Sequence, residues 1–164
     1  MNPTILIVED HDAVRASLRD WLSVAFPRCE FLEARSGEDA LVQVAAQQFD
    51  IVLMDIGLPQ MNGIEATRQI KATAPQTRVV MLTIYEEQAF QADAAAVGAS
   101  AYVAKRKMGT ELVPVLTALL AGDGNSGTPG GKRSAGSENG TPASAHSELQ
   151  HTSASAADDG ARGR

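Results

Sequence analysis

The sequence predicts a doubly wound α/β domain built on a five-stranded parallel sheet with strand order 2-1-3-4-5. Five short apolar runs recur along residues 1–121, and each is followed by a segment with helical apolar spacing. The central runs, at residues 5–8, 51–54 and 79–82, are apolar on both faces, which is typical of strands covered by helices on both sides. A chain of 164 residues is long enough for one such domain.

The first two strand–helix units have clear boundaries. A strand at residues 4–8 precedes a helix whose apolar face is formed by Val14, Leu18, Trp21 and Leu22. A second strand is expected at residues 29–34, with Cys29 filling it as a small apolar side chain. Ser36 followed by Asp39 predicts the N-cap and first turn of the next helix.

The remaining units follow the same pattern. A strand at residues 51–54 precedes a helix capped by Asn62. A strand at residues 78–83 precedes an alanine-rich helix over residues 86–97, with Gly98 as its C′ residue. The strand at residues 101–104 leads to the apolar stripe Leu112, Val115, Leu116, Leu119 and Leu120. Pro114 is expected in or just past the first turn of that helix, where a missing N–H costs least.

Composition changes after residue 121. Of the last 43 residues, 28 are Gly, Ser, Ala, Thr or Pro, and Leu149 is the single large apolar side chain. Such a segment cannot bury enough surface to fold alone. The sequence therefore predicts one domain over residues 1–121 and a disordered low-complexity tail over residues 122–164.

Charge and cysteine content exclude several classes of protein. Residues 1–121 carry 15 Asp and Glu against 10 Lys and Arg, so direct binding to DNA is not expected. One cysteine, Cys29, cannot form an internal disulfide and fits a reducing compartment. The N-terminus lacks the basic region of a signal peptide, and no apolar run is long enough to span a bilayer. We expect a cytoplasmic protein without a membrane segment.

Polar residues stand where the predicted strands end. Glu9 and Asp10 follow the first strand, Asp55 the third and Lys105 the fifth, while Thr83 ends the fourth. Sites of open α/β sheets form at the carboxyl ends of the strands, where strand order reverses, so the three acids should converge. Three neighbouring carboxylates repel one another unless a proton or a cation is present. A hard divalent ion such as Mg²⁺ meets that need.

These residue types suit phosphoryl acceptance. An aspartate such as Asp55 can act as nucleophile toward phosphorus and form an aspartyl phosphate. The incoming group brings negative charge, which Lys105, the Thr83 hydroxyl and a bound cation can stabilise. His11, beside the acids, is expected to be exposed and to orient them at most, because the pocket favours oxygen ligands.

The set of motifs resembles a response-regulator receiver domain of two-component systems. The resemblance rests on Glu9-Asp10, the block at residues 54–63, Thr83 and the run at residues 102–105, and it covers about residues 4–121. The run at residues 10–12 followed by Val14-Arg15, the run at residues 63–67 and Gly98-Ala99 are similar to the NarL/LuxR-type subfamily.

The resemblance implies a flavodoxin-like receiver fold and a phosphorylation switch. Asp55 would be the phosphoacceptor, and Thr83 and Lys105 would contact the phosphoryl group. Mg²⁺ would be held by Glu9, Asp10, Asp55 and the backbone carbonyl of Gly57, and Tyr102 would change exposure on activation. The implied partners are a sensor histidine kinase or phosphotransfer protein, or a small phosphodonor, and an unidentified downstream protein. A homodimer is a further alternative.

Departures from the family pattern leave other interpretations open. Arg106 follows Lys105 where many receivers have proline, Asn62 replaces a common aspartate, and no helix-turn-helix pattern follows Gly122. The chain could then be a constitutive, non-phosphorylated interaction module or the remnant of a truncated LuxR-type transcription factor. An enzyme with its own substrate is not expected. An aspartyl phosphatase would need an acid at Gly57, and a flavodoxin-like cofactor binder would need a Gly-, Ser- or Thr-rich loop at residues 9–12.

Overall fold

The computed structural model describes residues 2–84 and 88–122, which form alternating strands and helices. In chain order the elements are β1 (Thr4–Val8), α1 (Asp12–Ala25), β2 (Glu30–Ala34), α2 (Gly37–Ala46), β3 (Ile51–Asp55), α3 (Gly63–Thr73), β4 (Arg78–Thr83), α4 (Gln88–Ala96), β5 (Ala101–Ala104) and α5 (Met108–Leu120). A short 3₁₀ turn, Lys105–Lys107, joins β5 to α5.

The strand order is β2-β1-β3-β4-β5 and every pair is parallel, which confirms the predicted doubly wound sheet. The chain passes from β1 to β2 in one direction and then to β3 in the other, so β1 and β3 lie at the switch point. The register places Asp55 beside Leu82 and Thr83 beside Ala104. The carboxyl ends of four strands therefore lie along one edge of the sheet.

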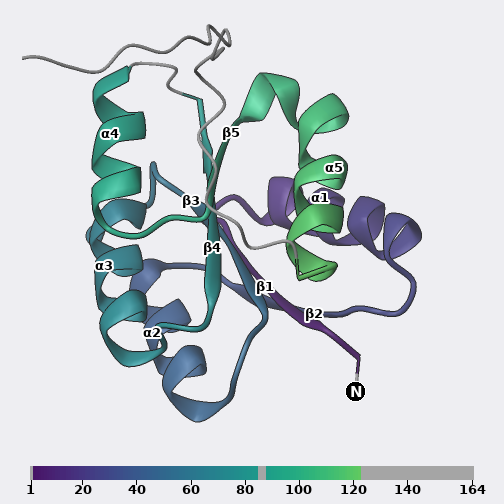
Figure 1. Ribbon diagram of the computed structural model, residues 1–164, viewed down its shortest axis with the longest axis horizontal. Coiled ribbons are helices and arrows are strands. Elements are labelled where there is room, and N and C mark those ends of the chain that lie inside the picture. The colour runs from purple at the N-terminus through teal and green to yellow at the C-terminus, as the bar shows by residue number, and fades with distance from the viewer. Residues whose placement is uncertain (1, 85–87, 123–164) are drawn as a thin grey trace, which may run out of the picture. The chain divides into compact units, whose positions relative to one another are not determined.

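Helices cover both faces of the sheet, with α2, α3 and α4 on one side and α1 and α5 on the other (Figure 1). Alternate strand residues feed two separate cores because successive side chains of a strand point to opposite faces. Leu6 and Val52 pack under α2 and α3, whereas Ile7 and Leu53 pack under α1 and α5. All four side chains are fully buried, so the strands that carry the predicted site are held on both faces.

Three of the predicted helix ends, at Ser36, Asn62 and Gly98, are confirmed. The Ser36 side chain accepts a hydrogen bond from the Asp39 N–H at 3.1 Å, and the Asn62 side chain accepts one from the Glu65 N–H at 2.9 Å. Gly98, after α4, has φ of +90°, a conformation that favours glycine. Residues 86 and 87, predicted to begin α4, lie outside the described residues.

Two predicted boundaries were wrong. β2 begins at Glu30, so Cys29 lies just before the strand, although its side chain still packs at the edge of the core. α5 begins at Met108, a turn earlier than expected, which puts Pro114 inside the helix. No side chain caps the start of α5, so the sequence carried no signal for that boundary.

The inner face of α1 also differs from the prediction. Arg15, Leu18 and Leu22 form the buried face, whereas Val14 is 38% exposed and Trp21 is half-buried. Arg15 lies on this face because its guanidinium donates to the buried Glu9 carbonyl and to the Glu33 and Asp12 carboxylates.

The predicted disordered tail at residues 122–164 lies, beyond Gly122, outside the described residues and stays a prediction. Within the described ranges no helix has the length and apolar character needed to cross a bilayer.

Candidate functional site

The ends of β1, β3 and β5 bring Glu9, Asp55 and Lys105 into direct contact. The Lys105 ammonium Nζ lies 2.7 Å from Glu9 Oε2 and 3.2 Å from Asp55 Oδ2. Glu9 and Asp55 are buried, with 1% and 5% of their surface exposed. Three residues separated by as many as 96 positions in the chain thus form one charged cluster at the carboxyl edge of the sheet.

Asp10 joins this cluster through His11. The His11 Nδ1 atom lies 3.1 Å from both Glu9 Oε1 and Asp10 Oδ1, and one ligand atom from each of the three residues lies within 4.8 Å of the others. The imidazole is 72% exposed, as the sequence led us to expect, so it covers the two acids from the solvent side. The third predicted metal-binding acid, Asp55, lies on the other side of Glu9, against Lys105.

Two glycines lie against Asp55. The Gly57 N–H donates to Asp55 Oδ1 at 3.2 Å, and a Cβ at Gly57 would meet the carboxylate only at ordinary contact distance. Gly63, the first residue of α3, is far more constrained, because a Cβ there would lie 2.1 Å from the Asp55 backbone oxygen. The predicted acceptor is therefore held by the start of α3 as well as by β3.

Thr83 and Tyr102 occupy different depths of the same edge. Thr83 ends β4 and is 1% exposed, in register with Ala104, the residue before Lys105. Tyr102 stands two residues before Ala104 on β5 and pairs with Met81 on β4. Its side chain is half-buried against the core under α2, α3 and α4. The fold thus brings Thr83 to the acidic edge, and it leaves Tyr102 further back along β5.

The pKa shifts in this cluster reflect burial and an excess of acidic over basic side chains. Burial raises the pKa of the Asp55 carboxyl, and Glu9 adds to that rise while Lys105 opposes it. Burial alone would lower the pKa of the Lys105 amine, but the hydrogen bond to Glu9 and the charge of Asp55 outweigh it and raise that pKa. The hydrogen bond to Glu9 and the charge of Asp10 raise the pKa of the His11 imidazole.

The donor set fits a hard divalent cation. Glu9, Asp10 and Asp55 contribute carboxylate oxygens, which Mg²⁺ prefers, and the partly buried Lys105 ammonium pairs with two of them, Glu9 and Asp55. A divalent ion would remove the remaining repulsion, so the chemistry of these side chains suits the predicted metal.

Sequence reasoning gave little weight to one residue of this region. Arg15 is 4% exposed, and its Nη1 donates to the Glu9 carbonyl oxygen at 2.7 Å. The available signal was its spacing, because Arg15 stands three and seven residues before Leu18 and Leu22, which is the period of a buried helix face.

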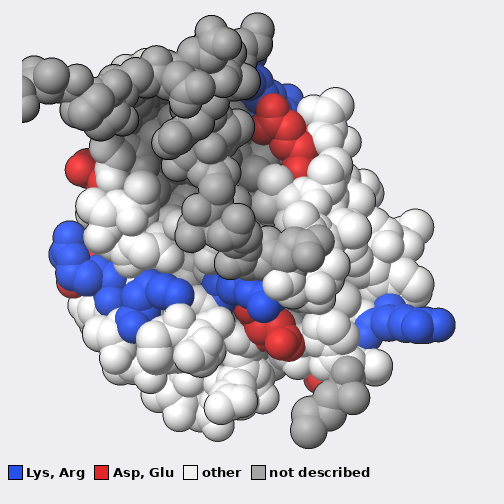
Figure 2. All heavy atoms as spheres, viewed as in Figure 1, with Lys and Arg blue, Asp and Glu red and all other residues white. Residues whose placement is uncertain are grey.

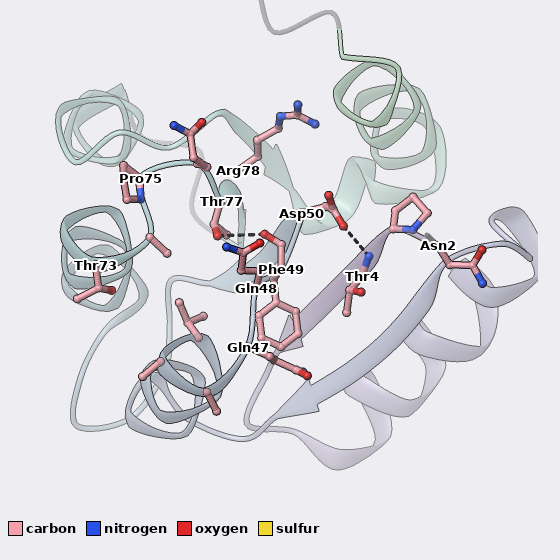
Figure 3. A pocket seen from close by; sticks show the side chains of 16 residues that line it. Asn2, Thr4, Gln47, Gln48, Phe49, Asp50, Thr73, Pro75, Thr77 and Arg78 are labelled. Carbon is pink, nitrogen blue, oxygen red and sulfur yellow. Dashed lines mark hydrogen bonds between the residues drawn. The ribbon is translucent and has the colours of Figure 1, made fainter.

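A hollow lies at the opposite edge of the sheet, where the strands begin (Figure 3). It has a volume of about 860 Å³ and is lined by the segments that precede β1, β3 and β4. Its polar groups bond to one another: Asp50 accepts from the Thr4 N–H at 2.8 Å, and the Thr77 hydroxyl donates to the Phe49 carbonyl at 3.0 Å. None of the predicted site residues lines it.

Comparison with known proteins identifies the family. Residues 5–117 match the model described as the response regulator receiver domain. Response regulator UvrY of Escherichia coli is 34% identical over 118 residues, which make up 72% of this chain and 54% of that protein. The chain therefore spans about half the length of the curated relatives it matches.

Solved structures agree with the sequence matches. A LuxR-family two-component response regulator from Aurantimonas has a TM-score of 0.70 and 35% identity, covering 74% of this chain and 87% of that one. Response regulator TrrA from Thermotoga maritima, solved in complex with Mg(2+)-BeF, has a TM-score of 0.64 and 27% identity, covering 71% and 98%. The resemblance to NarL/LuxR-type receivers is thereby confirmed, and the chain belongs to the response regulator receiver domain family.

Proposed function

We propose that this chain is a phosphorylation-dependent switch of two-component signalling, in which Asp55 accepts the phosphoryl group. The observation that carries this proposal is the Lys105 ammonium within 3.2 Å of the buried Asp55 carboxylate and 2.7 Å of Glu9. Family membership supports it, because receiver domains are phosphorylated and bind Mg²⁺.

The transfer step uses the chain's own carboxylate. An Asp55 oxygen attacks phosphorus and forms an O–P bond, while the P–N bond of a kinase phosphohistidine or the P–O bond of acetyl phosphate breaks. The leaving imidazole or acetate takes the electron pair of the broken bond. Lys105 then stabilises the charge of the new phosphoryl oxygens, and the Thr83 hydroxyl donates to one of them.

Mg²⁺ would be held by Glu9, Asp10, Asp55 and the Gly57 carbonyl, and when bound it supplies positive charge beside the transferred group. The partners proposed for this chain are a sensor histidine kinase or phosphotransfer protein upstream and a protein, or a second copy of the chain, downstream. Tyr102 would take part in the readout by changing its exposure.

Direct DNA binding is not part of this proposal. On the face shown in Figure 2, Asp and Glu side chains lie beside several of the Lys and Arg side chains. Nucleic-acid binding needs clustered positive charge, and the 15 Asp and Glu against 10 Lys and Arg of residues 1–121 do not favour it.

Labelling with acetyl phosphate tests the assignment. With Mg²⁺ present, intact-mass spectrometry is expected to detect one added phosphoryl group on the native chain and none on the Asp55→Asn variant. Asp50→Asn is the matched control, since Asp50 bonds the Thr4 N–H at the opposite edge of the sheet, and it should be labelled like the native chain. Equal labelling of Asp55→Asn would contradict the assignment of the acceptor, and no labelling of the native chain would favour a constitutive, non-phosphorylated interaction module.

A further inference from the structure

Arg15 is a buried cation that the proposed phosphoryl transfer does not use. It lies on the inner face of α1 with 4% of its surface exposed. A guanidinium cannot lose its proton in a protein, so each buried N–H needs an acceptor. The contacts that Arg15 makes therefore indicate why a charged side chain occupies a core position.

The guanidinium connects three segments around the first strand. Its Nη1 donates to the Glu9 carbonyl at 2.7 Å, its Nε donates to Glu33 Oε2 at 3.2 Å, and its Nη2 donates to Asp12 Oδ1. Glu33 stands on β2, next to β1, and Asp12 begins α1. Arg15 thus ties the turn after β1 to both neighbouring elements.

Hydrogen bonds hold the Glu9 backbone at both its N–H and its carbonyl group. Its N–H donates to the Ala34 carbonyl at 3.2 Å, which extends the pairing of β1 with β2 by one residue, and its carbonyl accepts from Arg15. With the backbone fixed, the Glu9 carboxylate reaches Lys105 with one oxygen and His11 with the other.

We propose that Arg15 is a positioning residue that holds the Glu9 carboxylate in place for the divalent cation. This inference rests on the proposed function, in which Glu9 is one of the metal-binding acids. Partners that orient metal-ligating groups are worth about 10- to 100-fold in metal affinity. Removing the guanidinium is therefore expected to weaken Mg²⁺ binding without removing any ligand.

The matched control for this test lies one turn further along α1. Arg19 also pairs with Glu33, through Nη1 and Oε1 at 2.9 Å, and with Asp20 at 3.0 Å, but its side chain is 45% exposed. Arg19→Met removes one arginine–Glu33 pair from the same helix and leaves the Arg15–Glu9 contact intact. Arg15→Met removes the contact while keeping an unbranched side chain.

The Mg²⁺ dissociation constant is measured by calorimetric titration of each folded chain, well below its melting temperature. The half-saturating Mg²⁺ concentration for acetyl phosphate labelling is measured beside it. Arg15→Met should raise both by about tenfold or more. The labelling rate at saturating Mg²⁺ should fall much less, and Arg19→Met should behave like the native chain.

Arg15→Lys provides rescue and a second variant should Arg15→Met fail to fold. A lysine ammonium can donate to the Glu9 carbonyl but cannot span Glu9, Asp12 and Glu33 as a guanidinium does, so an intermediate dissociation constant is expected. If Arg15→Met and Arg15→Lys lower the melting temperature yet bind Mg²⁺ like the native chain, Arg15 is merely structural and the inference is wrong. If the native chain binds no Mg²⁺ or takes no phosphoryl group, the proposed function itself is wrong. The measurements on the native chain therefore distinguish this failure from a failure of the inference about Arg15.

Discussion

Gly63 is the residue with the least room near the site. A Cβ there would lie 2.1 Å from the Asp55 oxygen and 2.9 Å from two further backbone atoms, none of which can rotate away. Gly63→Ala must therefore displace α3 from the end of β3. Overpacking against a side chain usually costs about 1–3 kcal/mol, and contact with backbone belongs at the upper end of that range or beyond it.

We expect Gly63→Ala to lower the free energy of unfolding by at least about 3 kcal/mol and to slow labelling of Asp55, as measured by urea denaturation and mass spectrometry. Gly109→Ala is the control, because no atom lies within 4 Å of a Cβ at that position in the first turn of α5. That change should raise the stability by up to about 1 kcal/mol, since alanine favours helix. Equal effects of the two substitutions would show that the contact at Gly63 is unimportant.

At the scale of single elements, α3 depends on its N-cap. The Asn62 side chain accepts the Glu65 N–H at 2.9 Å, and the backbone that follows lies against Asp55. An aspartate at position 62 could accept the same hydrogen bond and would add a negative charge at the positive end of the helix dipole. Asn62 thus differs from the common aspartate in its charge, whereas both side chains can cap the helix.

Asn62→Ala is expected to lower the free energy of unfolding by about 1 kcal/mol, because one helix N–H loses its acceptor. Asn62→Asp should retain the native stability or exceed it slightly. Chemical denaturation monitored by circular dichroism measures both. A loss for Asn62→Asp as large as that for Asn62→Ala would show that the asparagine has a role besides capping.

For the whole molecule, a cation that binds only the folded chain stabilises it by a free energy that grows with the logarithm of the cation concentration above the dissociation constant. At a Mg²⁺ concentration of 100 times the dissociation constant the gain is about 2.7 kcal/mol, so the melting temperature should rise by several degrees relative to the chain in a chelator. Asp10→Asn should reduce that rise, because it removes one carboxylate from the cluster. Calorimetry at matched ionic strength measures both, and an undiminished rise for Asp10→Asn would place the ion elsewhere.

The sequence predicts the sheet well because the strands that carry it are apolar on both faces. Strand order and the polar residues at the strand ends then bring Glu9, Asp55 and Lys105 to one edge, and the structure agrees. Side-chain partners were harder to foresee. Arg15 stands beside an apolar stripe where an arginine usually lies in solvent, and its acceptors come from other segments of the chain.

The start of α5 was missed for a different reason. The helix is entered through a 3₁₀ turn at Lys105–Lys107 and has no capping side chain, so neither polarity nor a cap marks its first residue. The apolar stripe alone indicated a later start, and Pro114 reinforced that interpretation. Boundaries without a local hydrogen-bonding signal depend on tertiary packing, which the sequence pattern does not reveal.

The start of α3 lies so close to the Asp55 backbone that only a glycine fits at position 63. Thr83 ends β4 and Lys105 follows β5, so the side chains proposed to contact the phosphoryl group stand on other elements than α3. A new charge on Asp55 would therefore act on the ends of β4 and β5 as well as on the start of α3. We therefore expect a protein that distinguishes the phosphorylated chain from the unphosphorylated one to contact the surface near the ends of β4 and β5.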